Sequence, residues 1–212
     1  MDIWLDTADR DEIRVHRSQV SGLTTNPSLM IAAGYTHYRA ACQAILAYGL
    51  PTSLETLSLD PDECYDQAIE LAGMSSLVIV KIPATPELVP VVTALAEQEI
   101  PINLTAVCSL VQAAMFSPYL PADAIVSVFA GRIADTGRHP DVLVRTIADR
   151  HRTLWASTRE LLNVIQARDA GCEIITLSPA LVAKLDMLDA DLDEVARMTV
   201  AQFTGDGERM EW

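Results

Sequence analysis

The chain of 212 residues is 50% hydrophobic and 21% charged, a balance typical of a compact globular protein that excludes a disordered or fibrous one. Fifteen Lys and Arg residues against 29 Asp and Glu residues give a formal net charge of −14, so the surface would repel a nucleic-acid backbone, and we expect no nucleic-acid partner. This length suits one α/β barrel, and we expect a single domain over residues 1–212.

The first residues and the cysteines indicate the compartment. Residues 1–6 carry acidic side chains where a secretory signal carries basic ones, and no apolar run approaches the ~20 residues that cross a bilayer. The four cysteines stand singly, without the spacing of a zinc site or a disulfide framework. We therefore expect a cytoplasmic protein with buried free thiols and no membrane partner.

Short apolar runs alternate with longer amphipathic segments, as in repeated β–α units. The expected strands, in chain order, cover residues 3–5, 20–24, 52–57, 77–82, 100–104, 124–129, 153–157 and 173–177. The expected helices cover residues 9–16, 27–48, 61–73, 86–98, 109–116, 140–150, 159–170 and 179–188, with a last helix over 191–203 that no strand follows.

Eight such units predict a (β/α)8 barrel, the TIM-barrel architecture, with an extra C-terminal helix that caps the barrel or docks on a neighbouring subunit. The structural alternative is a doubly wound open sheet. That fold favours a glycine-rich phosphate loop after the first strand, which this sequence lacks.

Polar side chains stand at the ends of the predicted strands, where a barrel carries its active site. Lys81 is the central one, because it lies in an almost continuous apolar run over residues 77–83. Burial disfavours the charged ammonium group, and a neutral amine is a nucleophile that forms a Schiff base with a carbonyl carbon. The alternative is a lysine whose head group reaches solvent.

Two carboxylates accompany this lysine. Asp6 ends the first predicted strand and Glu55 lies in the third, so both can face the same barrel mouth. Together they supply a base for a substrate hydroxyl and a group that moves protons through water. Each taken alone also fits a helix cap or a solvated carboxylate.

A candidate anion site follows the sixth and seventh predicted strands. Arg132 and Arg159 lie there, with Ser127 and Ser157 close by in the sequence. Guanidinium groups bind phosphate oxygens in pairs, and surface ion pairing with the many carboxylates is the alternative. The four histidines are scattered without metal-ligand spacing, so we expect no metal site.

The chain resembles the transaldolases, specifically the short group that also contains the bacterial fructose-6-phosphate aldolases, through segments that contain Asp6, Lys81, Arg132, Ser157 and Arg159. The matching segments are Trp4-Leu5-Asp6-Thr7, Gly22-Leu23-Thr24-Thr25-Asn26-Pro27-Ser28, Val80-Lys81-Ile82-Pro83, Asn103-Leu104-Thr105, Phe129-Ala130-Gly131-Arg132, Ser157-Thr158-Arg159 and Ala170-Gly171-Cys172. They occur in order over about residues 1–185.

The resemblance implies a cofactor-free enzyme that acts on sugar phosphates. Lys81 would attack the ketone of fructose 6-phosphate or sedoheptulose 7-phosphate, Glu55 with Thr105 would hold a proton-shuttling water, and Asp6 would deprotonate the substrate hydroxyl beside the scissile bond. The dihydroxyacetone left on the lysine would pass to an aldose phosphate. The resemblance assigns the remaining contacts with the substrate to Thr24, Asn26, Asn103, Ser127, Phe129, Arg132, Ser157 and Arg159.

Two positions distinguish the activities within this group. The aldolases carry Gln in the third strand and Tyr at the end of the sixth, whereas this chain has Glu55 and Phe129, as the transaldolases do. Transfer is therefore expected, with an aldolase that releases free dihydroxyacetone, or a non-catalytic sugar-phosphate-binding relative, as alternatives. The resemblance also suggests a homo-oligomer, a pentamer or a decamer of pentamers, in which the C-terminal helix bridges subunits.

Overall fold

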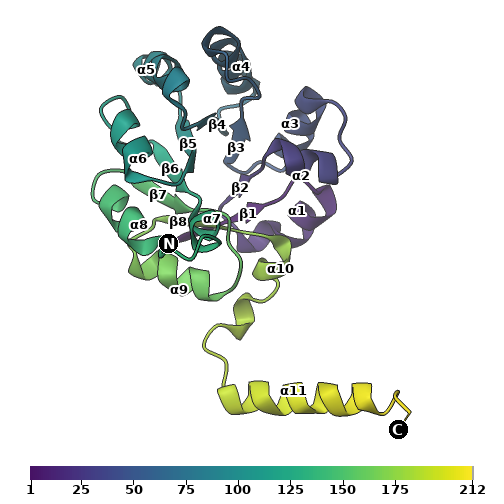
Figure 1. Ribbon diagram of the computed structural model, residues 1–212. Coiled ribbons are helices and arrows are strands. Elements are labelled where there is room, and N and C mark those ends of the chain that lie inside the picture. The colour runs from purple at the N-terminus through teal and green to yellow at the C-terminus, as the bar shows by residue number, and fades with distance from the viewer. Residues whose placement is uncertain (212) are drawn as a thin grey trace.

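A computed structural model describes residues 1–211, so Trp212, the last residue of the expected single domain, lies outside the described residues. Its core is a closed barrel of parallel strands that pair in chain order, which confirms the barrel and excludes the open sheet (Figure 1). The strands are β1 (Asp2–Asp6), β2 (Gly22–Thr24), β3 (Thr52–Glu55), β4 (Val78–Pro83), β5 (Ile102–Val107), β6 (Ile125–Val128), β7 (Arg152–Trp155) and β8 (Ile174–Leu177).

Helices surround the barrel. They are α1 (Arg10–His16), α2 (Pro27–Ala32), α3 (Tyr38–Leu46), α4 (Pro61–Met74), α5 (Val89–Glu97), α6 (Leu110–Phe116), α7 (Ala130–Ala134), α8 (Asp141–Ala148), α9 (Leu162–Asp169), α10 (Pro179–Val182) and α11 (Leu192–Gly207), with short 3-10 turns at Arg17–Gln19, Pro86–Leu88 and Leu185–Met187. The side chains of Asp9 and Asp60 each accept hydrogen bonds from two backbone N–H groups, which starts α1 and α4.

Three helical segments differ from the sequence prediction. The helix expected over residues 179–188 is the short helix α10 followed by the 3-10 turn Leu185–Met187. The single helix expected over residues 27–48 is two helices, because the chain turns after α2 at Gly34, whose φ of 84° favours glycine. The short helix α7 was not expected, and it follows β6 directly. It places Arg132 beside the barrel mouth.

The barrel interior has an apolar floor. Alternate strand residues point inward, and Trp4, Ile125, Leu154 and Ile174 form a buried cluster there. Gly22 is opposite Trp4 in the β1–β2 pairing, and a Cβ on Gly22 would lie 2.5 Å from the indole ring. The glycine therefore makes room for the tryptophan that fills the floor, and the inward positions nearer the strand ends are left to polar residues.

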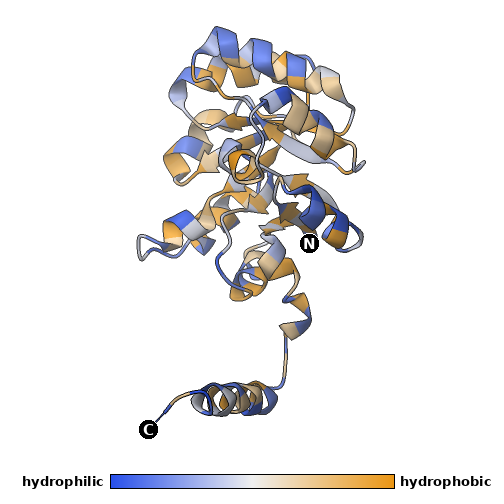
Figure 2. Cartoon of the chain, turned by 90° about the vertical axis from the view of Figure 1, so that its right-hand side faces the viewer, coloured by the Kyte–Doolittle hydropathy of each residue, from blue (hydrophilic) through white to orange (hydrophobic). Residues whose placement is uncertain are grey.

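The C-terminal helix α11 stands apart from the barrel at the end of a thin connection (Figures 1 and 2). None of its residues is buried, and Phe203 is 67% exposed. Among the helices described in residues 1–211, none has both the length and the apolar character needed to cross a membrane.

Candidate active site

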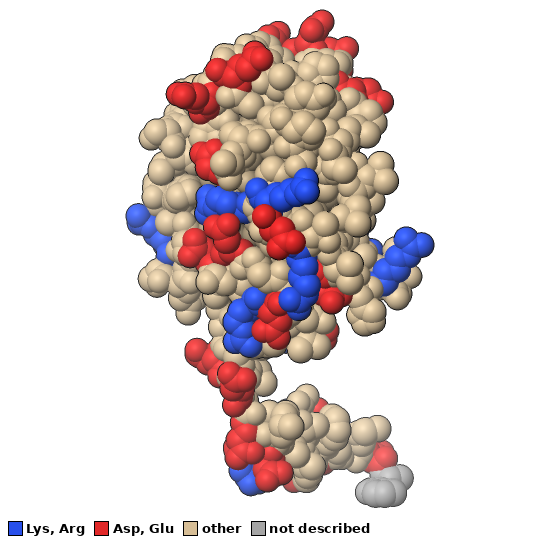
Figure 3. All heavy atoms as spheres, turned by 90° about the vertical axis from the view of Figure 1, so that its left-hand side faces the viewer, with Lys and Arg blue, Asp and Glu red and all other residues tan. Residues whose placement is uncertain are grey.

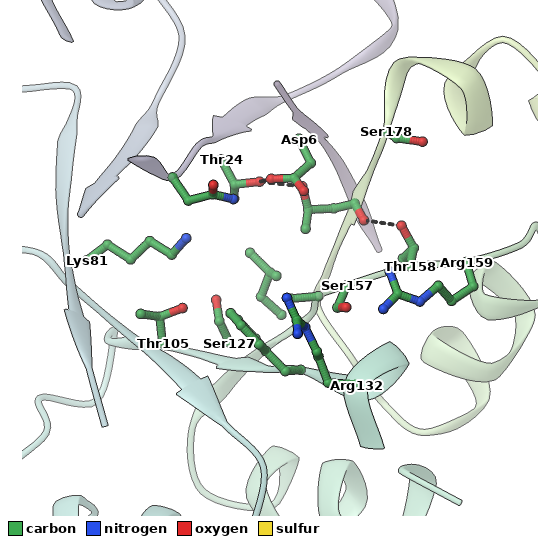
Figure 4. Close-up of a pocket in the computed structure, with 15 residues that line it drawn as sticks. Asp6, Thr24, Lys81, Thr105, Ser127, Arg132, Ser157, Thr158, Arg159 and Ser178 are labelled. Carbon is green, nitrogen blue, oxygen red and sulfur yellow. Dashed lines mark hydrogen bonds between the residues drawn. The ribbon is translucent and has the colours of Figure 1, made fainter. Parts of the chain in front are cut away.

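A cavity of about 290 Å³ opens at the C-terminal ends of the strands (Figure 4). All of the site residues predicted from the sequence line it except Glu55 and Asn103. The lining residues are Asp6, Thr24, Asn26, Lys81, Thr105, Ser127, Phe129, Arg132, Leu154, Ala156, Ser157, Thr158, Arg159, Thr176 and Ser178.

Strand register places the lysine next to its carboxylate. Glu55 on β3 is opposite Lys81 on β4, and Lys81 is opposite Asn103 on β5. The Lys81 side chain is 6% exposed, and its Nζ lies 3.2 Å from Glu55 Oε2 and donates a hydrogen bond of 3.0 Å to the Thr25 carbonyl. The amine is thus buried, with a proton acceptor in contact, and its end points into the cavity (Figure 4).

Asp6 lies on the wall of the cavity at the end of β1. The Thr24 hydroxyl donates a 2.7 Å hydrogen bond to Asp6 Oδ1. Burial raises the pKa of Asp6 above its ordinary value, while the bond from Thr24 and the positive charge of Lys81 lower it. The balance leaves a carboxyl that gains a proton at higher pH than an exposed one does.

The two asparagines are held in different ways. Asn103 is fully buried below the cavity, where its Nδ2 donates to Ser53 Oγ at 2.9 Å and its Oδ1 accepts from Ser127 Oγ at 2.7 Å. Asn26 precedes α2, and its Oδ1 accepts the N–H of Leu29 at 3.0 Å. These bonds orient both amides, so that the Asn26 side chain presents its NH₂ group to the cavity.

Arg132, Ser157 and Arg159 line the end of the cavity opposite Lys81 (Figure 4). Arg159 Nη2 donates to Asp135 Oδ2 at 2.7 Å, and this bond raises the pKa of Arg159 and lowers that of Asp135. Ser157 has a φ of 62°, an uncommon conformation for a residue with a side chain. Arg159 thus forms the surface ion pair that the sequence left open as an alternative, and it also lines the cavity.

Acidic side chains elsewhere are dispersed. Figure 3 shows acidic and basic side chains interspersed over the middle of one face of the molecule. Within residues 1–211, no group of three or more His, Cys, Asp or Glu side chains lies close enough to hold a metal ion. The cavity residues Lys81, Arg132 and Arg159 bring positive charge together, and they are the candidates for binding an anionic ligand.

The sequence model of the family described as Transaldolase/Fructose-6-phosphate aldolase matches residues 3–210. The chain belongs to this transaldolase family. It is 35% identical over 189 residues to a probable transaldolase of Dehalococcoides mccartyi, covering 84% of this chain and 86% of that protein. A probable transaldolase of Roseiflexus castenholzii is 37% identical over 187 residues, covering 83% of this chain and 85% of that protein. The family resemblance seen in the sequence is thus confirmed.

A solved structure shares the fold of this transaldolase-family chain. It is a chain of a cube-shaped, highly porous protein cage designed by fusing symmetric oligomeric domains, with a TM-score of 0.56 and 14% sequence identity. The match covers 98% of this chain and 78% of that chain. At this identity the likeness concerns the fold alone.

Four polar residues at this transaldolase-family site were missed from the sequence. Thr158, Thr176 and Ser178 line the cavity, and Ser53 accepts a hydrogen bond from Asn103. A signal was present for Thr176, which lies two residues after the inward-facing Ile174 in the last strand and therefore faces inward as well.

Proposed function

We propose that the chain is a transaldolase, which transfers a dihydroxyacetone unit from fructose 6-phosphate or sedoheptulose 7-phosphate to an aldose phosphate through a Schiff base on Lys81. One observation carries the proposal. A buried amine contacts a carboxylate at 3.2 Å and shares its cavity with Asp6 at the wall and with Arg132 and Arg159 at the far end. An amine, two carboxylates and an anion site are what the reaction needs.

The first step forms the covalent intermediate. Glu55 accepts a proton from the Lys81 ammonium, and the neutral amine attacks the C2 carbonyl of the ketose phosphate. Glu55 and Thr105 then direct protons through a water molecule as the carbinolamine loses water to give the iminium. The Thr105 hydroxyl is buried beside the cavity without a hydrogen-bond partner among residues 1–211, which leaves it available for this water.

The second step breaks the C3–C4 bond. Asp6 accepts the proton of the C4 hydroxyl, that oxygen becomes the aldehyde carbonyl, and the bonding electron pair moves through C3 and C2 to the iminium nitrogen. The aldose phosphate departs, and the three carbons stay on Lys81 as an enamine. The acceptor aldehyde reverses these events, so Asp6 returns the proton to the new hydroxyl.

Substrate binding divides the cavity. Arg132, Ser157 and Arg159 bind the phosphate, and Thr24, Asn26 and Ser127 bind the sugar hydroxyls. Asn103, which does not line the cavity, acts on the substrate through Ser127, whose hydroxyl donates to its Oδ1. Phe129 lines the cavity with a ring that has no hydroxyl to donate to the enamine or to a water. Its position supports transfer to an acceptor over release of free dihydroxyacetone.

Borohydride reduction tests the covalent step. The chain has only two lysines, Lys81 and the exposed Lys184, so a trapped lysine is identified without ambiguity. With fructose 6-phosphate present, we expect a three-carbon adduct on the Lys81 peptide by mass spectrometry and none on the Lys184 peptide. An unmodified Lys81 during turnover would contradict the proposal.

Dependence on the acceptor distinguishes the alternatives. We expect consumption of fructose 6-phosphate to require erythrose 4-phosphate. Dihydroxyacetone released at the same rate without that acceptor would instead identify an aldolase. Sugar-phosphate binding by the wild type and by Lys81→Ala, with no turnover in either, would identify a non-catalytic relative.

We also propose that the enzyme is a homo-oligomer in which α11 packs on a second copy. Leu192, Val195, Thr199 and Phe203 recur every three or four residues and form one stripe of this helix. Its exposure leaves the stripe without a partner in its own barrel.

We propose a cytoplasmic location, a compartment in which thiols stay reduced. Cys42, Cys64 and Cys172 are buried as the sequence predicts, whereas Cys108 is exposed, contrary to the expectation.

The double variant Val195→Glu/Phe203→Glu is expected to reduce the molecular mass in solution towards that of one chain. Each copy would then place two charges in the stripe that the second copy is proposed to bury. Light scattering after gel filtration measures the mass, and circular dichroism checks that the barrel remains folded. The control Ala201→Glu/Thr204→Glu adds the same two charges on the opposite side of the helix and should keep the wild-type mass. An unchanged mass in the stripe variant would contradict the interface.

A further inference from the structure

Thr176 forms the far end of a buried chain of hydroxyl groups that reaches Asp6. Its Oγ1 lies 2.6 Å from Thr24 Oγ1, and Thr24 Oγ1 lies 2.7 Å from Asp6 Oδ1. Thr176 and Thr24 are each 3% exposed. The three residues come from β8, β2 and β1, so these two hydrogen bonds join the first two strands of the barrel to the last.

The direction of the protons in this chain is fixed by chemistry. A threonine hydroxyl can donate only one hydrogen bond. Thr24 donates its bond to the ionised Asp6 carboxylate, which can only accept. Thr176 must therefore donate to Thr24, since two hydroxyls at 2.6 Å need one donor between them. Thr176 therefore donates a hydrogen bond to Thr24, and Thr24 donates one to Asp6 Oδ1.

A second bond holds the strand end that carries Thr176. Thr158 Oγ1 donates to the Thr176 carbonyl at 3.0 Å, which ties the loop after β7 to β8. The Thr176 side chain has its partner on the opposite side, towards β1 and β2. The hydroxyl therefore acts on Asp6, while its own backbone is fixed independently of Asp6.

We propose that Thr176 is a positioning residue for the proton transfer at Asp6, acting through Thr24. The inference deepens the proposed function and rests on Asp6 as the base. The donor from Thr176 polarises the Thr24 hydroxyl, which strengthens its bond to the carboxylate and holds the Asp6 side chain in one orientation. Oδ1 is occupied by this bond, which leaves Oδ2 for the hydroxyl of the substrate.

The charged surroundings set the direction of the effect. The charged groups near Asp6 are Lys81 from β4 with Glu55 from β3 beside it, and Arg132 and Arg159 at the far end of the cavity. None of these changes when Thr176 is replaced. A hydrogen bond donated to a carboxylate favours its charged form, so weakening that bond raises the pKa of Asp6.

The test uses the full-length protein and titrates Asp6 directly. Carboxyl-labelled aspartate is followed by ¹³C NMR in the free protein, and the Asp6 signal is assigned by its loss in Asp6→Asn. In Thr176→Val we expect the Asp6 titration midpoint to rise by about half a pH unit. Thr24→Val should raise it further, because the bond to the carboxylate is then lost, and Thr176→Ser should restore the wild-type midpoint.

A matched control separates this effect from general damage. Thr153→Val makes the same change at a buried threonine on β7 that does not line the cavity, and it should leave the Asp6 midpoint in place. An unchanged midpoint in Thr176→Val, or an equal shift in Thr153→Val, would overturn the proposal. If Thr176→Val fails to fold, the comparison of Thr176→Ser with Thr176→Ala decides it, with a shift expected only for alanine.

Kinetics then connect the titration to the proposed reaction. The ionised Asp6 is the active form, so the acid limb of kcat/KM for transfer should move to higher pH in Thr176→Val by the same amount as the NMR midpoint. An NMR shift in a protein without transfer activity would support the hydroxyl chain and contradict the proposed function. Active enzyme with an unmoved midpoint and an unmoved limb would contradict the hydroxyl chain alone.

Discussion

Replacing Lys81 by methionine is expected to lower kcat/KM for transfer by at least about 10⁴-fold, because the proposed reaction proceeds through a covalent bond to this amine. Methionine keeps an unbranched chain in a site where the side chain is 6% exposed. The control Lys184→Met removes the other lysine, which is exposed, and should leave the rate unchanged. Initial rates over a range of donor concentrations, at a fixed acceptor concentration, give kcat/KM for both variants.

The same substitution has an expected effect on stability. Glu55 loses the cation that lies 3.2 Å away, and an unpaired carboxylate that is 19% exposed remains poorly solvated. We expect the free energy of unfolding at pH 7 to fall by about 1–3 kcal/mol, less than for a fully buried pair. Denaturant unfolding of Lys81→Met/Glu55→Gln should show a smaller loss, because the uncompensated charge is removed as well.

These two measurements separate catalysis from folding. A Lys81→Met protein that is folded at the assay temperature and still transfers at a rate near that of the wild type would exclude a Schiff base at this residue. If Lys81→Met is inactive because it is unfolded, the double variant Lys81→Met/Glu55→Gln is used instead, since it is expected to fold without the amine. A folded double variant that transfers more slowly than Glu55→Gln alone supports the proposed role of Lys81.

Strand positions and the inward residues of the site could be predicted from the sequence because both follow from local patterns. Each of the predicted strands overlaps a strand of the structure, and the alternation of a strand fixes which residues face inward once its floor is known. Parallel pairing without a shift then places Glu55 beside Lys81. The family resemblance supplied the proposed roles that alternation alone does not.

The remaining features depend on contacts between segments far apart in the chain. Thr176 meets Thr24 across 152 residues, and only closure of the barrel brings them together. Arg159 pairs with Asp135 because the unexpected helix α7 ends beside the loop after β7. Local periodicity contains no information on either pair, and a short helix of five residues is below the length at which a helical pattern is recognisable.

Gly131→Ala is expected to separate the two halves of the proposed phosphate site. A Cβ on Gly131 would lie 1.6 Å from the Ser157 carbonyl oxygen and 2.8 Å from its carbonyl carbon, so backbone must move to admit a methyl group. Arg132 is the next residue on α7, and Arg159 follows Ser157 on the other side of the contact. Moving the segments apart therefore moves the two arginines apart.

We expect two consequences of this displacement. The free energy of unfolding should fall by about 1–3 kcal/mol, as for other overpacked sites. KM for the ketose phosphate should rise by about 10- to 100-fold, which corresponds to the loss of one charge-assisted hydrogen bond to the phosphate. Urea unfolding and initial rates measure the two effects, and kcat should fall less than KM rises because Lys81 and Asp6 lie at the other end of the cavity.

Gly73→Ala is the matched control. Gly73 lies in α4 with nothing within 4 Å of an added Cβ, so alanine there should leave KM unchanged and raise the stability by up to about 1 kcal/mol through its better helix propensity. If Gly131→Ala instead kept the wild-type stability and KM, the close approach of α7 to Ser157 would not be what holds Arg132 and Arg159 on one phosphate. The contrast between the two glycines thus tests a contact between backbones, which no side-chain truncation at the site can reach.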